Sequence, residues 1–263
     1  MAGKTVTHGR LQVHMFGCLQ DNYGFLVHEP EQQVTAAIDT PDARAVNAAL
    51  RETGWHLTHI LNTHHHFDHA GGNEALKAEW GCTIVGAESD RKRIPGIDQG
   101  VREGDAITLG RVQGRVLEVS GHTIGHIAYH FPEEKVAFVG DTLFVLGCGR
   151  LFEGTPEQMW QSLNKLMALP DDTIIYCAHE YTQANARFAL SVDPDNQALQ
   201  QRAAEIDRLR AAGTPTVPTR LALEKQTNPF LRPDDAGMQQ HLDMVGQDPV
   251  SVFAEVRRRK DKF

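Results

Sequence analysis

The segment Thr63–His69, T-H-H-H-F-D-H, concentrates side chains that bind metal ions, and it directly follows a predicted strand. Side chains at positions i and i+2 of an extended segment point the same way, so His64 and His66 can bind one ion together. Where the chain then turns, Asp68 and His69 become adjacent ligands that face a second ion. Imidazole and carboxylate suit Zn²⁺, Fe²⁺ or Mn²⁺, and the absence of thiolates in this motif argues against a structural zinc cage.

Three further candidate ligands stand just beyond other predicted strands, because the first motif alone does not complete two sites. His122 lies in S-G-H-T, Asp141 in G-D-T-L-F and His179 in C-A-H-E-Y. A single His or Asp at such a position is usually a loop or capping residue. Three in succession, together with the first motif, predict a centre that holds two ions.

Other polar residues near these motifs leave alternatives open. Asp39, at the end of an early strand, could accept a hydrogen bond from a ligand His or could cap the following helix. His126, four residues after His122, could orient a ligand or cap a turn, and the structural role is favoured. His65 should point away from the ions. Cys148 lies in a glycine-rich turn without an adjacent base, so no nucleophile is assigned.

Composition excludes several classes of protein. The chain has 263 residues, of which 41% are hydrophobic and 23% charged, as in an ordinary globular protein. Its longest apolar run, Ile174–Ala178, is far shorter than a membrane span of about 20 residues, and Met1–Gly17 does not resemble a secretory signal. The net charge of −8 has the wrong sign for a general nucleic-acid binder. Four scattered cysteines predict a cytoplasmic protein without disulfides.

The elements that position the motifs alternate between strands and helices over the first 180 residues. We expect strands at 11–16, 23–28, 34–38, 57–62, 83–85, 115–119, 127–131, 136–139 and 173–177, and helices at 41–52, 74–80 and 156–168. Gly86–Gly110 reads as a loop. Thr155 is a suitable N-cap, since Pro156 follows it at the first helical position.

After Tyr181 the pattern becomes helical and no strand is expected. Helices are predicted at 183–190, 196–212, 235–244 and 249–260. We therefore predict an α/β domain over residues 1–180 and an α-helical domain over residues 181–263.

The ligand motifs, in their order and spacing, resemble those of the metallo-β-lactamase superfamily over about the first 180 residues. The resemblance implies a four-layer αββα sandwich with the metal ions at one edge between two sheets. It also implies a role for each ligand: His64, His66 and His122 would hold the first ion, Asp68, His69 and His179 the second, and Asp141 would bridge them. Asp68 and Asp141 are then the expected catalytic carboxylates.

Longer motifs resemble the glyoxalase II, or hydroxyacylglutathione hydrolase, family nearly from end to end. They are G-D-T-L-F-V-L-G-C-G-R-L-F-E-G-T (Gly140–Thr155), A-H-E-Y-T (Ala178–Thr182), N-P-F-L-R (Asn228–Arg232) and the terminal R-R-R-K-D-K-F. The resemblance implies hydrolysis of the thioester S-D-lactoylglutathione to D-lactate and glutathione. It includes the helical C-terminal domain, which many members of the superfamily lack.

The same resemblance implies a set of glutathione-binding residues. Tyr181, Arg257 and Lys260 match the family pattern, and the last two lie three apart, on one helical face, where they could bind glutathione carboxylates. Arg150 and Phe152 stand where animal members carry Lys and Tyr. Arg150 keeps the positive charge and can hold a carboxylate through two hydrogen bonds, whereas Phe152 lacks the hydroxyl and could weaken binding.

The expected chemistry needs two divalent ions per chain, zinc in the first place, with iron or manganese as alternatives. Two ions that share a water lower its pKa from about 16 toward 7 and so provide a metal-bridging hydroxide to attack the thioester carbonyl. An alternative is a glutathione persulfide dioxygenase with a mononuclear iron site, although those relatives lack the long helical C-terminus. A non-catalytic metal-binding module is a third possibility. We expect a monomer that binds neither nucleic acid nor membranes.

Overall fold

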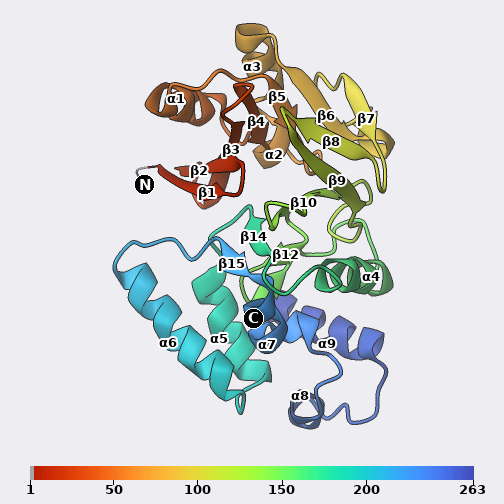
Figure 1. Cartoon of the computed structure of the whole chain (residues 1–263). Helices are drawn as coiled ribbons and strands as arrows, with labels where there is room; N and C mark the ends of the chain where they lie inside the picture. Colours follow the sequence, from red (N-terminus) through yellow and green to blue (C-terminus); the bar gives the residue numbers. More distant parts are fainter. Residues whose placement is uncertain (1–2) are drawn as a thin grey trace. The chain divides into compact units, whose positions relative to one another are not determined.

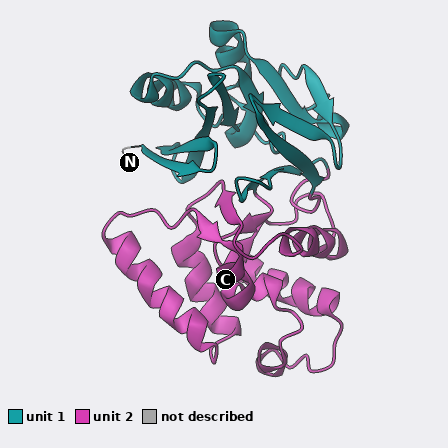
Figure 2. Cartoon of the chain, viewed as in Figure 1, with its two compact units in different colours: residues 1–118, 125–140 teal, residues 119–124, 141–263 magenta. Residues whose placement is uncertain are grey.

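The computed structural model describes residues 3–263, which form two compact units (Figures 1 and 2). Unit 1 contains the chain up to Glu118 together with Gly125–Gly140, and unit 2 contains Val119–Ile124 and Asp141–Phe263. Each unit is a compactly packed group of residues, and unit 2 contains residues 141–180 as well as the C-terminal helices. The predicted domains, 1–180 and 181–263, stay a prediction.

Unit 1 contains a seven-stranded sheet in the order β1-β2-β3-β4-β5-β6-β7. The first four strands pair antiparallel and the last four pair parallel. Its strands are β1 (Lys4–His8), β2 (Leu11–Cys18), β3 (Asn22–Glu29), β4 (Val34–Ile38), β5 (His59–Leu61), β6 (Thr83–Ala87) and β7 (Gln99–Val101). Parallel pairing brings the carboxyl ends of β4 and β5 to the same edge, where the first metal-binding motif begins.

Two helices, α1 (Ala43–Thr53) and α3 (Asn73–Trp80), pack on one face of this sheet. Val46, Leu50 and Leu76 are buried there in one apolar cluster with side chains of the sheet, which fixes the helices by removal of apolar surface from water. The helix predicted at 41–52 begins two residues later than expected. Its N-cap is Asp42, whose side chain accepts the Arg44 N–H, so the alternative role of Asp39 as the cap of this helix was wrong.

A second set of strands in unit 1 pairs antiparallel in sequence order: β8 (Ala106–Leu109), β9 (Val112–Glu118), β10 (Ile127–Phe131) and β11 (Val136–Gly140). It faces the first sheet, since the rings of Phe25 on β3 and Phe138 on β11 lie 5.7 Å apart. The prediction of a loop over Gly86–Gly110 was wrong, because this stretch contains β7, β8 and the 3-10 turn η1 (Glu88–Asp90).

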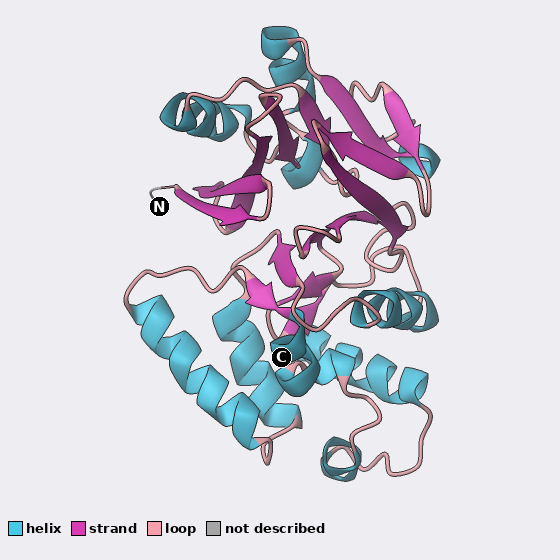
Figure 3. Cartoon of the chain, in the orientation of Figure 1, coloured by secondary structure: helices cyan, strands magenta, loops and turns pink. Residues whose placement is uncertain are grey.

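Unit 2 is mostly helical and contains four short strands (Figure 3). The strands are β12 (Leu143–Phe144), β13 (Gly147–Cys148), β14 (Ile174–Cys177) and β15 (Thr219–Arg220), and the helices are α4 (Pro156–Met167), α5 (Thr182–Val192), α6 (Gln197–Ala211), α7 (Leu221–Thr227), α8 (Ala236–His241) and α9 (Pro249–Lys262), with the 3-10 turn η2 (Pro229–Leu231). Thr155 forms the predicted N-cap of α4, within a capping box with Gln158. The prediction omitted β15 and α7 and made α8 too long.

Aromatic packing joins the helices of unit 2 around η2. The ring of Phe230 lies 6.0 Å from Phe188 of α5 and 6.0 Å from Phe253 of α9, which in turn lies 6.1 Å from Trp160 of α4. N-P-F-L-R, a motif singled out from the sequence, therefore forms the centre of the helical core. In residues 3–263 no helix has the length and apolar character that crossing a membrane requires.

Candidate active site

Asp39 supports the first metal-binding motif from the neighbouring strand. Its carboxylate accepts the backbone N–H and the hydroxyl of Thr63, each at 2.7 Å, and lies 2.8 Å from Nδ1 of His69. Asp39 adopts a positive φ of 58°, a conformation that Asp and Asn tolerate better than most residues. The predicted contact between Asp39 and a histidine of the motif is confirmed, and the role of His69 as a metal ligand stays a prediction. Since Nδ1 of His69 faces the carboxylate, Nε2 is the nitrogen that could bind an ion.

The donor atoms of the first motif lie at distances that suit shared ions. Nε2 of His64 lies 3.0 Å from Nδ1 of His66, and Nε2 of His69 lies 3.6 Å from Oδ2 of Asp68. Two atoms that bind one ion at about 2.0–2.2 Å are separated by about 3–3.6 Å. The structure therefore brings together two pairs of predicted ligands within unit 1, His64 with His66 and Asp68 with His69. The donor atoms of both pairs suit a divalent ion.

Unit 2 brings the other three predicted ligands together around Asp141. Oδ2 of this carboxylate lies 3.4 Å from Nε2 of His122, and Oδ1 lies 3.3 Å from Nε2 of His179. Each oxygen thus faces a different histidine, as in a carboxylate that bridges two ions. Nδ1 of His122 lies 2.7 Å from the backbone oxygen of Arg150. A hydrogen bond there fixes the ring so that its other nitrogen faces Asp141.

Three neighbours of these ligands show how the surroundings hold them. Nδ1 of His65 lies 3.0 Å from the buried carboxylate of Asp90, away from its flanking ligands, as expected. The ring of His126 stacks on that of His64 with 4.6 Å between centroids, a packing role. The amide of Asn22 donates to Oδ2 of Asp68 at 3.2 Å. Sequence reasoning missed Asp90 and Asn22, since neither lies near a motif and only the fold brings them to it.

Two predicted substrate-binding aromatics contact predicted metal ligands of unit 2. Tyr181 stacks on His179 with nearly parallel rings 4.7 Å apart, and Phe152 meets His122 at 5.2 Å. Tyr181 is 38% exposed and Phe152 is 60% exposed. Arg150 is also exposed and its guanidinium lies 5.9 Å from the ring of Phe152. These three residues offer an accessible aromatic and cationic surface beside the ligands.

The two predicted substrate-binding residues on α9 differ in exposure, since Lys260 is half-buried and Arg257 is buried. Nζ of Lys260 lies 3.3 Å from the carbonyl oxygen of Ala184, and burial, followed by the nearby arginines, lowers its pKa to about 8. Arg257 is only 6% exposed, and it donates to the backbone oxygen of Cys148 at 3.0 Å and to Asp261 at 2.7 Å. Its contacts favour a structural role, and its contact with glutathione stays a prediction.

Cys148 is buried, and burial raises the pKa of its thiol to about 11. A thiol in that environment is protonated at neutral pH and unreactive. The absence of a nucleophilic role for this residue agrees with the expectation from sequence.

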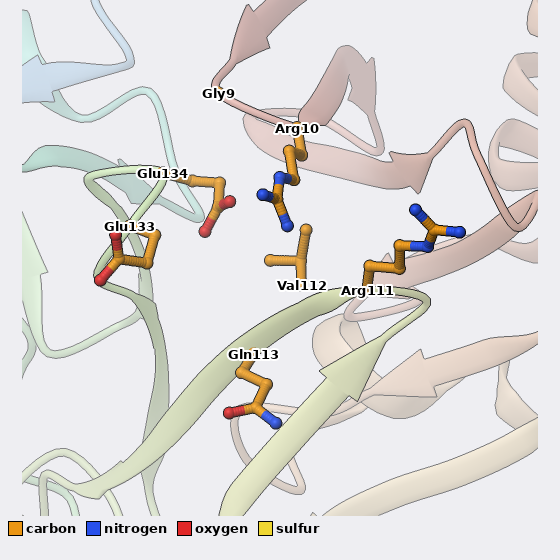
Figure 4. A pocket seen from close by; sticks show the side chains of 7 residues that line it. All are labelled: Gly9, Arg10, Arg111, Val112, Gln113, Glu133 and Glu134. Carbon is orange, nitrogen blue, oxygen red and sulfur yellow. The ribbon is translucent and has the colours of Figure 1, made fainter.

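A pocket of about 390 Å³ lies in unit 1, at the turns that follow β1, β8 and β10 (Figure 4). Arg10 and Glu134 extend toward each other across it, whereas the side chain of Arg111 points away. Glu134 is almost fully buried and burial raises the pKa of its carboxyl. None of the predicted site residues lines this pocket, and we assign it no part in the chemistry.

Comparisons with known proteins agree with the family resemblance that the motifs indicate. A family model described as the metallo-beta-lactamase superfamily matches residues 36–179, and one described as the hydroxyacylglutathione hydrolase C-terminus matches residues 180–263. Among solved structures, ETHE1 from Myxococcus xanthus has a TM-score of 0.64 at 24% identity and covers 99% of this chain and 98% of its own. The fold and the donor chemistry are thus those of a divalent-metal-binding α/β protein of the metallo-β-lactamase superfamily.

Curated relatives identify a more specific family within the superfamily. The hydroxyacylglutathione hydrolase of Maricaulis maris is 58% identical over 96% of this chain and 99% of its own, and that of Brucella anthropi is 55% identical over 97% and 98%. The chain belongs to the hydroxyacylglutathione hydrolase family, a family of thioester hydrolases. The resemblance inferred from the motifs is confirmed.

Proposed function

We propose that this chain hydrolyses S-D-lactoylglutathione to D-lactate and glutathione. Its identity of 54–58% to curated relatives of that name, over nearly the whole chain, carries the proposal. Both parts of the family match are present: the α/β region with the ligand motifs and the helical C-terminus.

The proposed centre contains two divalent ions, zinc in the first place. His64, His66 and His122 would hold one ion, Asp68, His69 and His179 would hold the other, and Asp141 would be shared by both. The two carboxylate oxygens of Asp141, each facing one histidine, support this assignment. The number of two ions is also supported by a solved structure titled as TTHA1623 in a di-iron-bound form, with 26% identity and a TM-score of 0.59 over 82% of this chain and 98% of its own.

The protein residues hold the predicted metal ligands in place for this reaction. When bound, the ions act as Lewis acids and lower the pKa of water toward 7, so that hydroxide is available at neutral pH. Asp39 and the backbone oxygen of Arg150 orient the rings of His69 and His122, and Asn22 holds the carboxylate of Asp68. Attack on the thioester carbonyl breaks the carbon–sulfur bond and releases glutathione as a thiolate. Because a thiolate leaves readily, the chain needs no strong general acid.

Substrate binding is assigned to the exposed surface beside these ligands. The cations of Arg150 and Lys260 would pair with the carboxylates of glutathione, and Tyr181 would contact its peptide part. Charge-assisted bonds of this type are about twice as strong as neutral ones. The exposure of Arg150 and Tyr181 supports this role, since both can be reached from solvent.

The alternative, a persulfide dioxygenase with one iron, is less well supported. The relatives at 54–58% identity carry the hydrolase name, and the C-terminal family model that matches residues 180–263 is that of the hydrolase. The similarity to ETHE1 is below 25% identity and shows the fold alone.

One preparation tests the function, the alternative and the metal content together. The purified chain is loaded with zinc, iron or manganese, and its metal is measured by elemental analysis. We expect about two ions per chain and release of free thiol from S-D-lactoylglutathione in step with loss of thioester. One iron per chain, with oxygen consumption on glutathione persulfide and no thioester hydrolysis, would establish the alternative instead.

The location and oligomeric state belong to the same proposal. We propose a cytoplasmic monomer, and the four free, buried cysteines support a reducing compartment. Light scattering of the protein as it elutes from a size-exclusion column tests this prediction, because a monomer has a mass near 29.2 kDa.

A further inference from the structure

The hairpin β12–β13 of unit 2 is held by side chains of the C-terminal helices. Its own ladder is minimal, with only Leu143 opposite Cys148 and Phe144 opposite Gly147. The side-chain amide of Asn228 donates to the backbone oxygens of Phe144 at 3.1 Å and of Gly147 at 3.0 Å. One amide thus bonds both sides of the turn.

Three other side chains complete this support. Glu224 accepts the backbone N–H of Leu146 at 2.9 Å, the amide of Asn185 donates to Val145 O at 3.1 Å, and Arg257 donates to Cys148 O at 3.0 Å. Each residue from 144 to 148 therefore has a backbone group bonded to one of four side chains. We call Asn185, Glu224, Asn228 and Arg257 the hairpin cradle.

The cradle is itself fixed in the core of unit 2. Glu224 is fully buried and pairs with the guanidinium of Arg202, which also donates to Thr219 at 2.9 Å. Asn228 accepts the N–H of Phe230 and so caps η2 while its amide reaches the hairpin. A buried ion pair is weak evidence for stability but can impose one specific arrangement.

The turn needs such support for two reasons. Leu146 adopts a positive φ of 57°, which is unfavourable for a residue with a branched side chain. The backbone groups of the turn are buried, and a buried group without a partner is costly. Without the cradle the hairpin would therefore relax.

The hairpin leads directly to the substrate-binding surface. The ring of Phe144 lies 5.9 Å from the ring of His179 and 5.3 Å from that of Tyr181. Asn228 thus holds the backbone of the residue whose side chain packs against a metal ligand and a predicted glutathione ligand. At the other end, Asp261 accepts from Arg257 and lies 3.5 Å from Nε of Arg150.

We propose that Asn228, with Glu224 and Asn185, is a positioning residue for glutathione binding: the cradle holds the β12–β13 hairpin so that Phe144 and Arg150 shape the substrate surface. The inference rests on the proposed function and assigns the C-terminal helices a second task. Besides contributing residues that meet the substrate, they hold the segment that follows Asp141.

Asn228→Ala is compared with Asn196→Ala in the metal-loaded enzyme. Asn196 is a matched control, since it also caps a helix through its side-chain oxygen and donates its amide to a backbone oxygen, that of Gln226, but it does not touch the hairpin. For Asn228→Ala we expect KM to rise about tenfold with kcat changed less than about threefold. Amide hydrogen exchange across residues 143–148 should become at least about tenfold faster. Asn196→Ala should change neither.

The proposal is overturned if Asn228→Ala leaves both exchange and KM unchanged, or if Asn196→Ala changes both to the same extent. If Asn228→Ala does not fold, Asn185→Ala removes one cradle bond and should change both quantities in the same direction to a smaller degree; no change in that folded variant overturns the proposal. If the wild-type enzyme hydrolyses no glutathione thioester, the proposed function fails, while the exchange comparison still decides whether the cradle holds the hairpin.

Discussion

The predicted metal ligands and the predicted glutathione-binding residues differ in how firmly the protein holds them. His64 and His69 are fully buried, and each has a ring nitrogen beside a neighbouring side chain. Phe152 is 60% exposed, and the side chain of Arg150 is 59% exposed. A misplaced ligand costs metal affinity, whereas an exposed cation can reach a flexible carboxylate from several positions. We therefore expect substitutions at Arg150 and Phe152 to be tolerated better than substitutions of the predicted metal ligands.

Arg257 is an exception, because it is a predicted glutathione-binding residue that is as buried as the predicted metal ligands. Its sequence position groups it with the substrate-binding cations, but its burial and its bonds to Cys148 and Asp261 resemble those of a structural residue. Spacing on a helix shows which residues share a face, but it does not show whether that face is turned to solvent or to a neighbouring segment.

The largest expected effect is that of Asp141→Ala, which tests the predicted metal ligands. Removing the carboxylate that faces both His122 and His179 should lower turnover by at least about a thousandfold and reduce the bound metal. Turnover and elemental analysis of one preparation measure both. Asp171→Ala is the control, since it removes only a surface ion pair with Lys225. Full activity of Asp141→Ala with normal metal content would refute the assignment.

Asp39→Asn should have a smaller effect, because it alters the support of a ligand and not a ligand itself. The neutral amide cannot accept from both Thr63 and His69 as the carboxylate does, so metal affinity should fall by about 10- to 100-fold. Asn tolerates the positive φ at this position, which separates the effect from misfolding. Competition with a chelator measures the affinity. Asp42→Asn, a change at a nearby helix cap that Asn serves equally well, should not alter it.

The sequence predicted the ligand-bearing edge well because its signals are local. The strand expected at 127–131 matches β10 and the strand expected at 34–38 matches β4. Both are short apolar runs that end at turn residues. The motifs that follow strands supplied the candidate ligands, and for Asp39 the sequence left two roles open between which the structure decides.

Contacts between distant residues could not be predicted. Asn22 and Asp68 are separated by 46 positions, and His65 and Asp90 by 25. Strands β7 and β15 contain only three and two residues, so their periodicity cannot be recognised, and they exist because a neighbouring strand offers hydrogen bonds. The cradle has no sequence signature either, since it joins side chains to backbone groups about 40 to 110 positions away.

Lys260 offers a pH-dependent test of the substrate-binding side of the comparison. Since its pKa is lowered to about 8, kcat/KM for the glutathione thioester should fall severalfold as pH rises from 7 to 9 and the ammonium is lost. Lys260→Arg keeps the charge and should remove this fall, and Lys260→Ala should have a low value throughout. A fall that persists unchanged in Lys260→Ala would show that another group causes it.

The lowered pKa of Lys260 also predicts how stability depends on pH, and here the expected change is a rise with pH, whereas kcat/KM is expected to fall. The folded protein lowers the pKa of Lys260 from 10.5 to about 8, so the unfolded chain binds more protons between these values. The contribution of Lys260 to the free energy of unfolding therefore increases as pH rises from about 8 to 10.5. Comparing denaturant unfolding of the wild type and Lys260→Arg at pH 8 and pH 10 isolates the contribution, and it does not depend on substrate.

The smallest expected effect is that of Phe152→Tyr, which adds one hydroxyl to the exposed surface. The ring already meets His122 and is largely exposed, so the substitution should not disturb the fold. One additional hydrogen bond contributes about 0.5–1.5 kcal/mol, so KM for S-D-lactoylglutathione should fall by about two- to tenfold with kcat unchanged. A short thioester that lacks the glutamyl and glycyl parts of glutathione is the control, and its KM should stay the same. An equal gain for both thioesters would place the hydroxyl at the acyl group, and the exposed surface would then take part in more than glutathione recognition.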